Sequence, residues 1–157
     1  MVQTKKEGEN VYQIGCLDKI SDYRKSRDGR ILINLTGVSR FKIINEISND
    51  KLYREFKVDY SDFCEDVENK QSKIDTKLIM NKAKKFFKKN GLLLNWKEFE
   101  KLDQLQRINT LSMISPITNE EKQKLLEAIS IEDKLNALES IINFYLYETG
   151  LNNQTIQ

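Results

Sequence analysis

The sequence predicts an α+β fold, in which a twisted β half is followed by a helical half. Up to about residue 62, apolar residues mostly alternate with polar ones, which is the pattern of half-buried strands. After about residue 68 they recur at three- and four-residue spacing, as in amphipathic helices. A chain of 157 residues can bury a sizeable core. We therefore expect a β subdomain over residues 1–62 and a helical subdomain over residues 68–150.

The sequence of the β half predicts two β-hairpins. Residues 11–23 form the first expected strand, in which Gly15 indicates a bulge or a close backbone approach. Cys16 shares a face with Ile14 and Ile20, so we expect it to be buried and slow to react with thiol reagents. The pair Asp28-Gly29 favours a type I′ turn.

The second expected hairpin joins residues 39–47 to residues 53–60. Gly37 is interpreted as the point where the chain turns between two strands. Arg40 is expected on the outward face, beside an inward Phe41.

Helix signals are frequent in the second half. A helix from residue 74 should end at Asn90-Gly91, and a second should begin at Asn95 and continue through Ile108. The stretch from Thr118 to Glu121 matches the capping box. A last helix should run from about residue 131 to about residue 150, and the single proline, Pro116, falls between helices.

Composition excludes several classes of function. The 26 basic and 24 acidic residues leave a net charge of +2, which is weak for a dedicated nucleic-acid binder. The absence of histidine removes most zinc sites and histidine-dependent catalysts, and neither a phosphate-binding GxxxxGK[ST] loop nor a GxSxG motif occurs. We therefore expect no cofactor, no metal and no catalytic residues.

The location of the protein is also indicated by composition. Two cysteines, Cys16 and Cys64, without a CxxC spacing fit a reducing cytoplasm. No apolar stretch approaches the roughly 20 residues that a membrane span needs. The sequence therefore predicts a cytoplasmic protein that does not act at a membrane.

Three charged or aromatic features leave alternatives open. The acidic group from Asp59 to Asp66 could hold a cation, but a solvated linker is favoured. The basic run over residues 82–89 could contact phosphates or a membrane surface, but lysines on the outer face of a packed helix are favoured. The tyrosines of the β half could form a stacking surface, but half-buried strand positions are favoured.

The order of motifs resembles that of one protein family. The first half, VYQIGCLDKISDYRKSRDGRILINLTGVSRFKI, contains Ile14-Gly15, Asp28-Gly29 and Gly37 followed by Arg40-Phe41. The second half contains ISPITNEEKQKLLEAISIEDKLNALESII. Both halves, in this order, resemble the substrate-binding domain at the amino terminus of Lon proteases, from residue 1 to residue 148.

The resemblance implies a PUA-like β pseudobarrel followed by a helical bundle, and a role in binding polypeptides. The candidate binding surface comprises Tyr12, Arg40, Tyr53 and Phe56. The family's ATPase and Ser-Lys peptidase modules do not occur in this sequence, so a non-catalytic module is expected, with an RNA-binding PUA-like module as the alternative. The family's opening Pro-Leu-Phe-Pro-Leu-like strand is also missing from it. An incomplete barrel with an open edge should then favour self-association.

Overall fold

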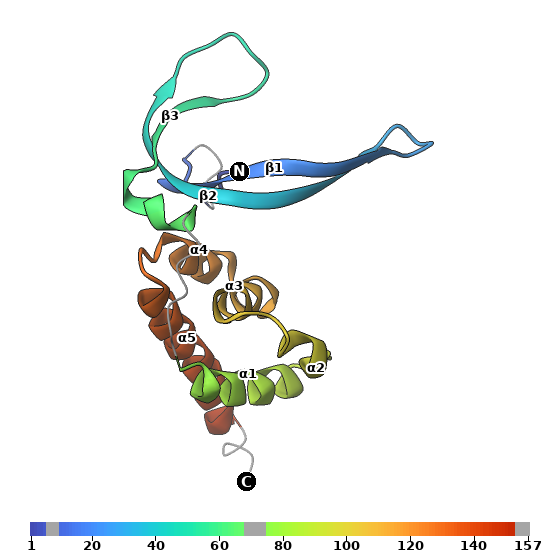
Figure 1. Ribbon diagram of the computed structural model, residues 1–157, viewed down its shortest axis with the longest axis vertical. Coiled ribbons are helices and arrows are strands. Elements are labelled where there is room, and N and C mark those ends of the chain that lie inside the picture. The colour runs from blue at the N-terminus through green and yellow to red at the C-terminus, as the bar shows by residue number, and fades with distance from the viewer. Residues whose placement is uncertain (6–9, 68–74, 153–157) are drawn as a thin grey trace. The chain divides into compact units, whose positions relative to one another are not determined.

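The computed structural model describes residues 1–5, 10–67 and 75–152. The chain divides into two compact units, Met1–Lys70 and Gln71–Gln157 (Figure 1). The first unit holds a three-stranded antiparallel sheet, and the second holds the α-helices. The predicted α+β class is confirmed.

The sheet has the strand order β1-β2-β3, with β1 over Ile14–Lys25, β2 over Ile31–Ile47 and β3 over Glu55–Asp59. β1 and β2 form one long ribbon, along which Ile14 pairs with Lys42 at the base and Lys25 pairs with Ile31 near the tip (Figure 1). β3 pairs only with residues 42–47 of β2. The sheet is therefore open, and β1 and β3 are its edge strands in the described part of the chain.

The tip of the ribbon differs from the predicted type I′ turn. That turn needs positive φ at both central residues. Among the described residues, positive φ occurs only at glycines, and Gly29 has a φ of 85°. The Gly29 N–H donates to the Ser26 carbonyl, and the Ser26 N–H donates to the Arg30 carbonyl. The connection is thus a three-residue loop that ends in a left-handed glycine.

Gly37 was predicted to lie at a turn, and this prediction is wrong. β2 runs through Gly37 without interruption, and Gly37 pairs with Asp18 of β1. The pairing shifts by one residue next to it, because Ser39 pairs with Leu17 and Val38 is left without a partner residue. The alternation of apolar and polar residues breaks at this point because of a β-bulge. The extra residue in β2 moves the side chains that follow it to the other face of the sheet.

The core of the first unit lies at the base of the ribbon, on the face that carries Phe41. Gly15 is buried beneath the Phe41 ring, and a Cβ at Gly15 would come within 2.6 Å of Phe41 Cζ. The predicted close approach at Gly15 is therefore confirmed. Ile43 and Phe63 complete the buried apolar set, and Phe63 belongs to the 3₁₀ segment η1, Ser61–Asp66, which packs against β2.

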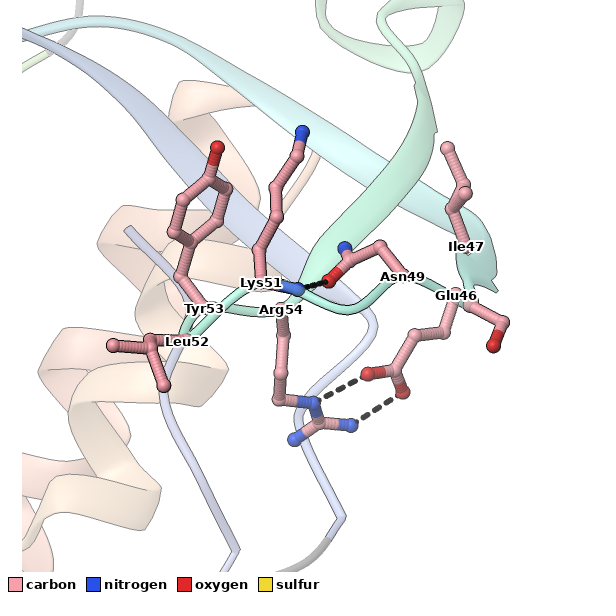
Figure 2. Close-up of a pocket in the computed structure, with 8 residues that line it drawn as sticks. Glu46, Ile47, Asn49, Lys51, Leu52, Tyr53 and Arg54 are labelled. Carbon is pink, nitrogen blue, oxygen red and sulfur yellow. Dashed lines mark hydrogen bonds and ion pairs between the residues drawn. The ribbon is translucent and has the colours of Figure 1, made fainter.

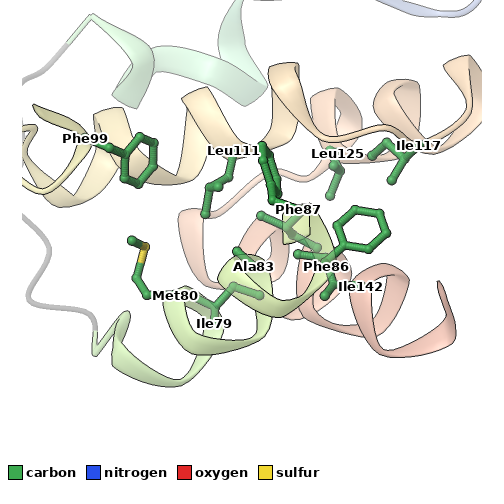
Figure 3. Packing of buried hydrophobic residues seen from close by; sticks show 11 residues of the cluster. Ile79, Met80, Ala83, Phe86, Phe87, Phe99, Leu111, Ile117, Leu125 and Ile142 are labelled. Carbon is green, nitrogen blue, oxygen red and sulfur yellow. The ribbon is translucent and has the colours of Figure 1, made fainter. Parts of the chain in front are cut away.

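The described part of the second unit holds five helices: α1 over Lys77–Lys89, α2 over Trp96–Phe99, α3 over Gln104–Ile114, α4 over Asn119–Glu127 and α5 over Ile131–Asn152. Apolar side chains from these helices and from the loop before α4 meet in one cluster (Figure 3). Ala83, Phe86 and Phe87 of the basic run point into it, and Lys82 and Lys84 pair with Glu139 and Glu100. The inward-packing interpretation of this run is confirmed.

Most of the predicted helix boundaries are confirmed. Gly91 has a φ of 66° directly after α1, and Thr118 forms a capping box with Glu121. The start of the first predicted helix at residue 74 lies outside the described residues. The second predicted helix is divided into α2 and α3, because Asp103 starts a new helix with a capping box of its own to Gln106.

Candidate polypeptide-binding surface

The distal half of the ribbon exposes one apolar face. We define the ribbon face by five side chains that are all exposed: Ile20, Tyr23, Ile31, Ile33 and Leu35. Directly opposite residues of an antiparallel pair share a face, and here Ile20 pairs with Leu35 and Tyr23 pairs with Ile33. Large exposed apolar patches mark binding surfaces, so this face is the first candidate.

A second β-bulge assembles this face. Ile20 pairs with Leu35 and Asp22 pairs with Asn34, which leaves Ser21 as the extra residue in β1. Without the bulge, Ile20 and Tyr23 would point to opposite faces, because side chains alternate along a strand. The opposite face of the ribbon carries Arg24, Asn34 and Leu32. The ribbon is therefore amphipathic, although its apolar face is not covered by a core.

The tip of the ribbon is basic. From residue 19 to residue 30 the sequence has five basic and two acidic side chains, a net charge of +3. The two acidic groups pair locally, Asp22 with Arg24 and Asp28 with Arg30. Hydrogen bonds from Arg30 hold the pKa of the Asp28 carboxyl below its usual range. The tip thus has a positive potential beside the apolar face.

The connection between β2 and β3 forms a shallow pocket with a second exposed apolar group (Figure 2). The Glu46 carboxylate accepts hydrogen bonds from Arg54 Nε and Nη2, each at 2.6 Å, and these lower the pKa of Glu46. Beside this ion pair, Leu52 is fully exposed and Tyr53 is largely exposed. The pairing fixes the connection while leaving two large apolar side chains in solvent.

The structure places the four predicted site residues in different settings. Tyr53 is exposed, and Phe56 is half-buried beneath the Arg54 guanidinium. Tyr12 is half-buried with the Lys5 ammonium 5.5 Å from its ring centroid. Arg40 lies on the face opposite Phe41, as predicted, but its side chain is only 12% exposed and bonds to Asp66. Of the four, Tyr53 is the most accessible to a partner.

Sequence reasoning missed the ribbon face as a unit. Its members were visible as the alternating residues Ile31, Ile33 and Leu35. Alternation alone predicts a buried face, and the bulge at Ser21 left no local signal because it depends on the pairing of two strands. The acidic group at the end of the first unit was also misread as a solvated linker, since Asp66 is a structural partner of Arg40.

The described residues offer neither a metal site nor a membrane-spanning helix. Residues 1–5, 10–67 and 75–152 contain no group of three or more cysteine, aspartate or glutamate side chains placed to hold a metal ion. None of the helices described there is both long enough and apolar enough to cross a bilayer.

Solved amino-terminal domains of Lon proteins have a fold similar to that of this chain. A Lon N-terminal domain protein from Xanthomonas campestris matches with a TM-score of 0.56 and 18% identity, over 85% of this chain and 69% of that one. The N-terminal domain of the Lon protease of the Mycobacterium avium complex matches with a TM-score of 0.61 and 17% identity, over 90% of this chain and 76% of that one. These likenesses establish the fold.

The sequence itself establishes the family. Residues 2–143 match the model of the ATP-dependent protease La (LON) substrate-binding domain, and the chain belongs to this family. A Lon protease of Halothermothrix orenii is 27% identical over 137 residues. These cover 85% of this chain but 17% of that protease, so the chain spans about a sixth of the length of this relative.

Proposed function

We propose that this chain is a non-catalytic module that binds polypeptides in unfolded or extended form. The observation that carries the proposal is the exposed ribbon face, because a monomeric protein rarely leaves so many large apolar side chains in solvent without a binding role. Membership of a substrate-binding domain family supports the same function. The two free cysteines support a cytoplasmic location, which we propose on that basis.

Binding to a permanently unfolded, alkylated polypeptide tests this proposal. The labelled polypeptide is titrated with the full chain and followed by fluorescence anisotropy, and a folded protein of similar size serves as the control. Saturable binding to the unfolded polypeptide is the expected result. A chain that keeps its circular dichroism spectrum and binds neither polypeptide would contradict the proposal.

An RNA-binding function is the alternative, and the basic tip of the ribbon is the observation that favours it. Binding of single-stranded RNA should then weaken steeply as salt is raised, because phosphate contacts release counterions. In the helical unit, the most basic run offers less support, since Lys82, Lys84 and Lys89 bond within the unit. Polypeptide binding is therefore the leading proposal.

The open sheet also supports the predicted self-association. An unpaired strand edge is a template for another chain, and apolar residues beside it favour association. Sedimentation velocity at increasing concentration tests this directly, and a monomer over the whole range would contradict it.

A further inference from the structure

One edge of the ribbon is free for hydrogen bonding. β3 covers the outer edge of β2 only along residues 42–47, and the Arg40 N–H donates to Asp66. From residue 31 to residue 39, no strand of the described part of the chain lies along that edge. A segment of nine residues is long enough to pair with one added strand of ordinary length.

The free edge borders the ribbon face. Ile31, Ile33 and Leu35 come from the same segment of β2 and point to one side of the ribbon. A strand added beside β2 would place its own alternate side chains next to these three, because neighbouring strands of a sheet share their faces. The geometry therefore selects a partner strand whose alternate residues are apolar.

The positive charge at the tip of the ribbon adds a second requirement on the partner strand. Among the five basic residues of the tip, Arg24 and Arg30 pair with Asp22 and Asp28. Lys19, Lys25 and Arg27 have no ion-pair partner in the described part of the chain. Lys25 pairs with Ile31 from β1, so it lies across β2 from the free edge and on the ribbon face near the tip, and Arg27 lies in the loop that leads into Ile31. Acidic side chains on a bound strand would neutralise these cations.

We propose that the outer edge of β2 over residues 31–39 takes one extended polypeptide strand, apolar at alternate positions and acidic at the end nearest Lys25 and Arg27. This inference rests on the proposed polypeptide-binding function and specifies its site, its backbone pairing and the chemistry of its partner. Main-chain hydrogen bonds give such a site affinity, and the side chains on one face give it selectivity.

The observations favour a polypeptide over two other occupants. A nucleic acid would use the cations of the tip but has no alternating N–H and C=O groups to pair with a strand edge. A second copy of the chain would bring another tip of charge +3 into the same assembly, and that tip offers no excess of acidic groups.

Backbone pairing is tested with N-methylated peptides and the full chain. The probe is a labelled nine-residue peptide with isoleucine or leucine at alternate positions and two glutamates at one end. Two versions carry N-methyl groups on alternate amides, and the two sets are offset by one residue. One set should lower affinity about tenfold, since it blocks the hydrogen bonds to β2, while the other set faces away and should leave affinity nearly unchanged.

Matched variants locate the site on the protein. Ile31→Ser on the ribbon face should lower affinity for the probe about tenfold. Leu32→Ser is its control, because Leu32 is 68% exposed against 63% for Ile31 but lies on the opposite face. Arg27→Glu should lower affinity about two- to fivefold at low salt, whereas Lys97→Glu in the helical unit should not.

The outcomes separate this inference from the proposed function. Equal effects of the two N-methylated sets, or of Ile31→Ser and Leu32→Ser, would overturn the inference, even where the unfolded polypeptide still binds. An affinity for the probe that is unchanged when its glutamates are replaced by lysines would overturn the charge requirement. If Ile31→Ser abolishes a dimer of the chain but leaves the affinity for the probe unchanged, the outer edge of β2 serves self-association instead. Failure of the unfolded polypeptide itself to bind is a failure of the proposed function.

Discussion

Arg40 and Asp66 form a three-bond contact that attaches η1 to the middle strand of the sheet. Asp66 Oδ2 accepts from the Arg40 N–H at 2.9 Å and from Arg40 Nε at 2.8 Å, and Oδ1 accepts from Nη2 at 2.7 Å. The guanidinium also lies 4.4 Å from the centroid of the Phe63 ring. One carboxylate thus satisfies both the backbone and the side chain of Arg40 on the edge of β2 that β3 leaves free.

Replacement of Asp66 by alanine should destabilise the fold by about 1–3 kcal/mol, because the two side chains are only 12% and 21% exposed and Arg40 would lose its three hydrogen bonds to Asp66. Asp22→Ala is the control, since the pair of Asp22 with Arg24 is well exposed and should contribute little. Urea unfolding followed by circular dichroism measures both. Equal midpoints for the two variants would show that the Arg40 contact has no structural role.

Gly15→Ala should destabilise the protein by about 1–3 kcal/mol through overpacking. The new Cβ would lie 2.6 Å from Phe41 Cζ and 2.7 Å from the Met1 carbonyl oxygen. Gly37→Ala is a matched control in the partner strand, where the nearest atom would be Cys16 Sγ at 3.4 Å, an ordinary contact. Thermal melting of both variants makes the comparison, and a larger loss for Gly37→Ala would contradict the packing of Phe41 on Gly15.

Local signals explain which parts of the fold could be predicted. Gly91 and the capping box at Thr118 were readable because each depends on residues within one turn of a helix. The capping box of Asp103 was overlooked although Gln106 follows it at the same spacing, and the apolar periodicity alone joined α2 to α3. A sequence signal therefore existed for that boundary.

Other features were not readable from one sequence. Arg40 and Asp66 are 26 residues apart, and no local pattern selects Asp66 from its acidic neighbours. The bulges at Val38 and Ser21 follow from the pairing of β1 with β2, so the exposed ribbon face could not be derived from alternation. Its residue type alone predicts Tyr53 as a site residue, and its exposure follows from the connection that Glu46 and Arg54 hold in place.

Cys64 should react with a thiol reagent faster than Cys16. Cys64 is exposed, and Cys16 is half-buried, whereas its strand face predicted a buried side chain. Burial, with a smaller contribution from Asp18, raises the pKa of the Cys16 thiol, so less thiolate is present at neutral pH. Labelling of the single-thiol variants Cys16→Ser and Cys64→Ser, each folded and in urea, measures the difference. Equal labelling rates of the two cysteines in the folded state would show that Cys16 is as accessible to the reagent as Cys64.

The ion pair of Glu46 with Arg54 should make the β2–β3 connection sensitive to acid. Hydrogen bonds from Arg54 lower the pKa of Glu46 in the folded state. A group with a lowered folded-state pKa stabilises the fold above its unfolded-state value, and that contribution is lost as pH falls through the folded-state pKa. Because both side chains are well exposed, the effect on global stability should be small and the effect on the connection local.

An NMR titration of the Glu46 carboxyl from pH 7 to pH 2 tests this relationship. In Arg54→Gln the pKa of Glu46 should rise toward its ordinary value, because the charged donor is lost. Lys57→Gln is the control: it removes one positive charge from β3, opposite Asn45, without removing a hydrogen bond to Glu46. The Arg54→Gln chain should also show a smaller acid-induced change in the Leu52 and Tyr53 resonances, since the ion pair of Glu46 with Arg54 is absent and only that of Lys51 with Glu55 remains in the connection. Equal shifts of the Glu46 pKa in the two variants would show that the general charge of the hairpin, and not the hydrogen bonds from Arg54, sets the pKa.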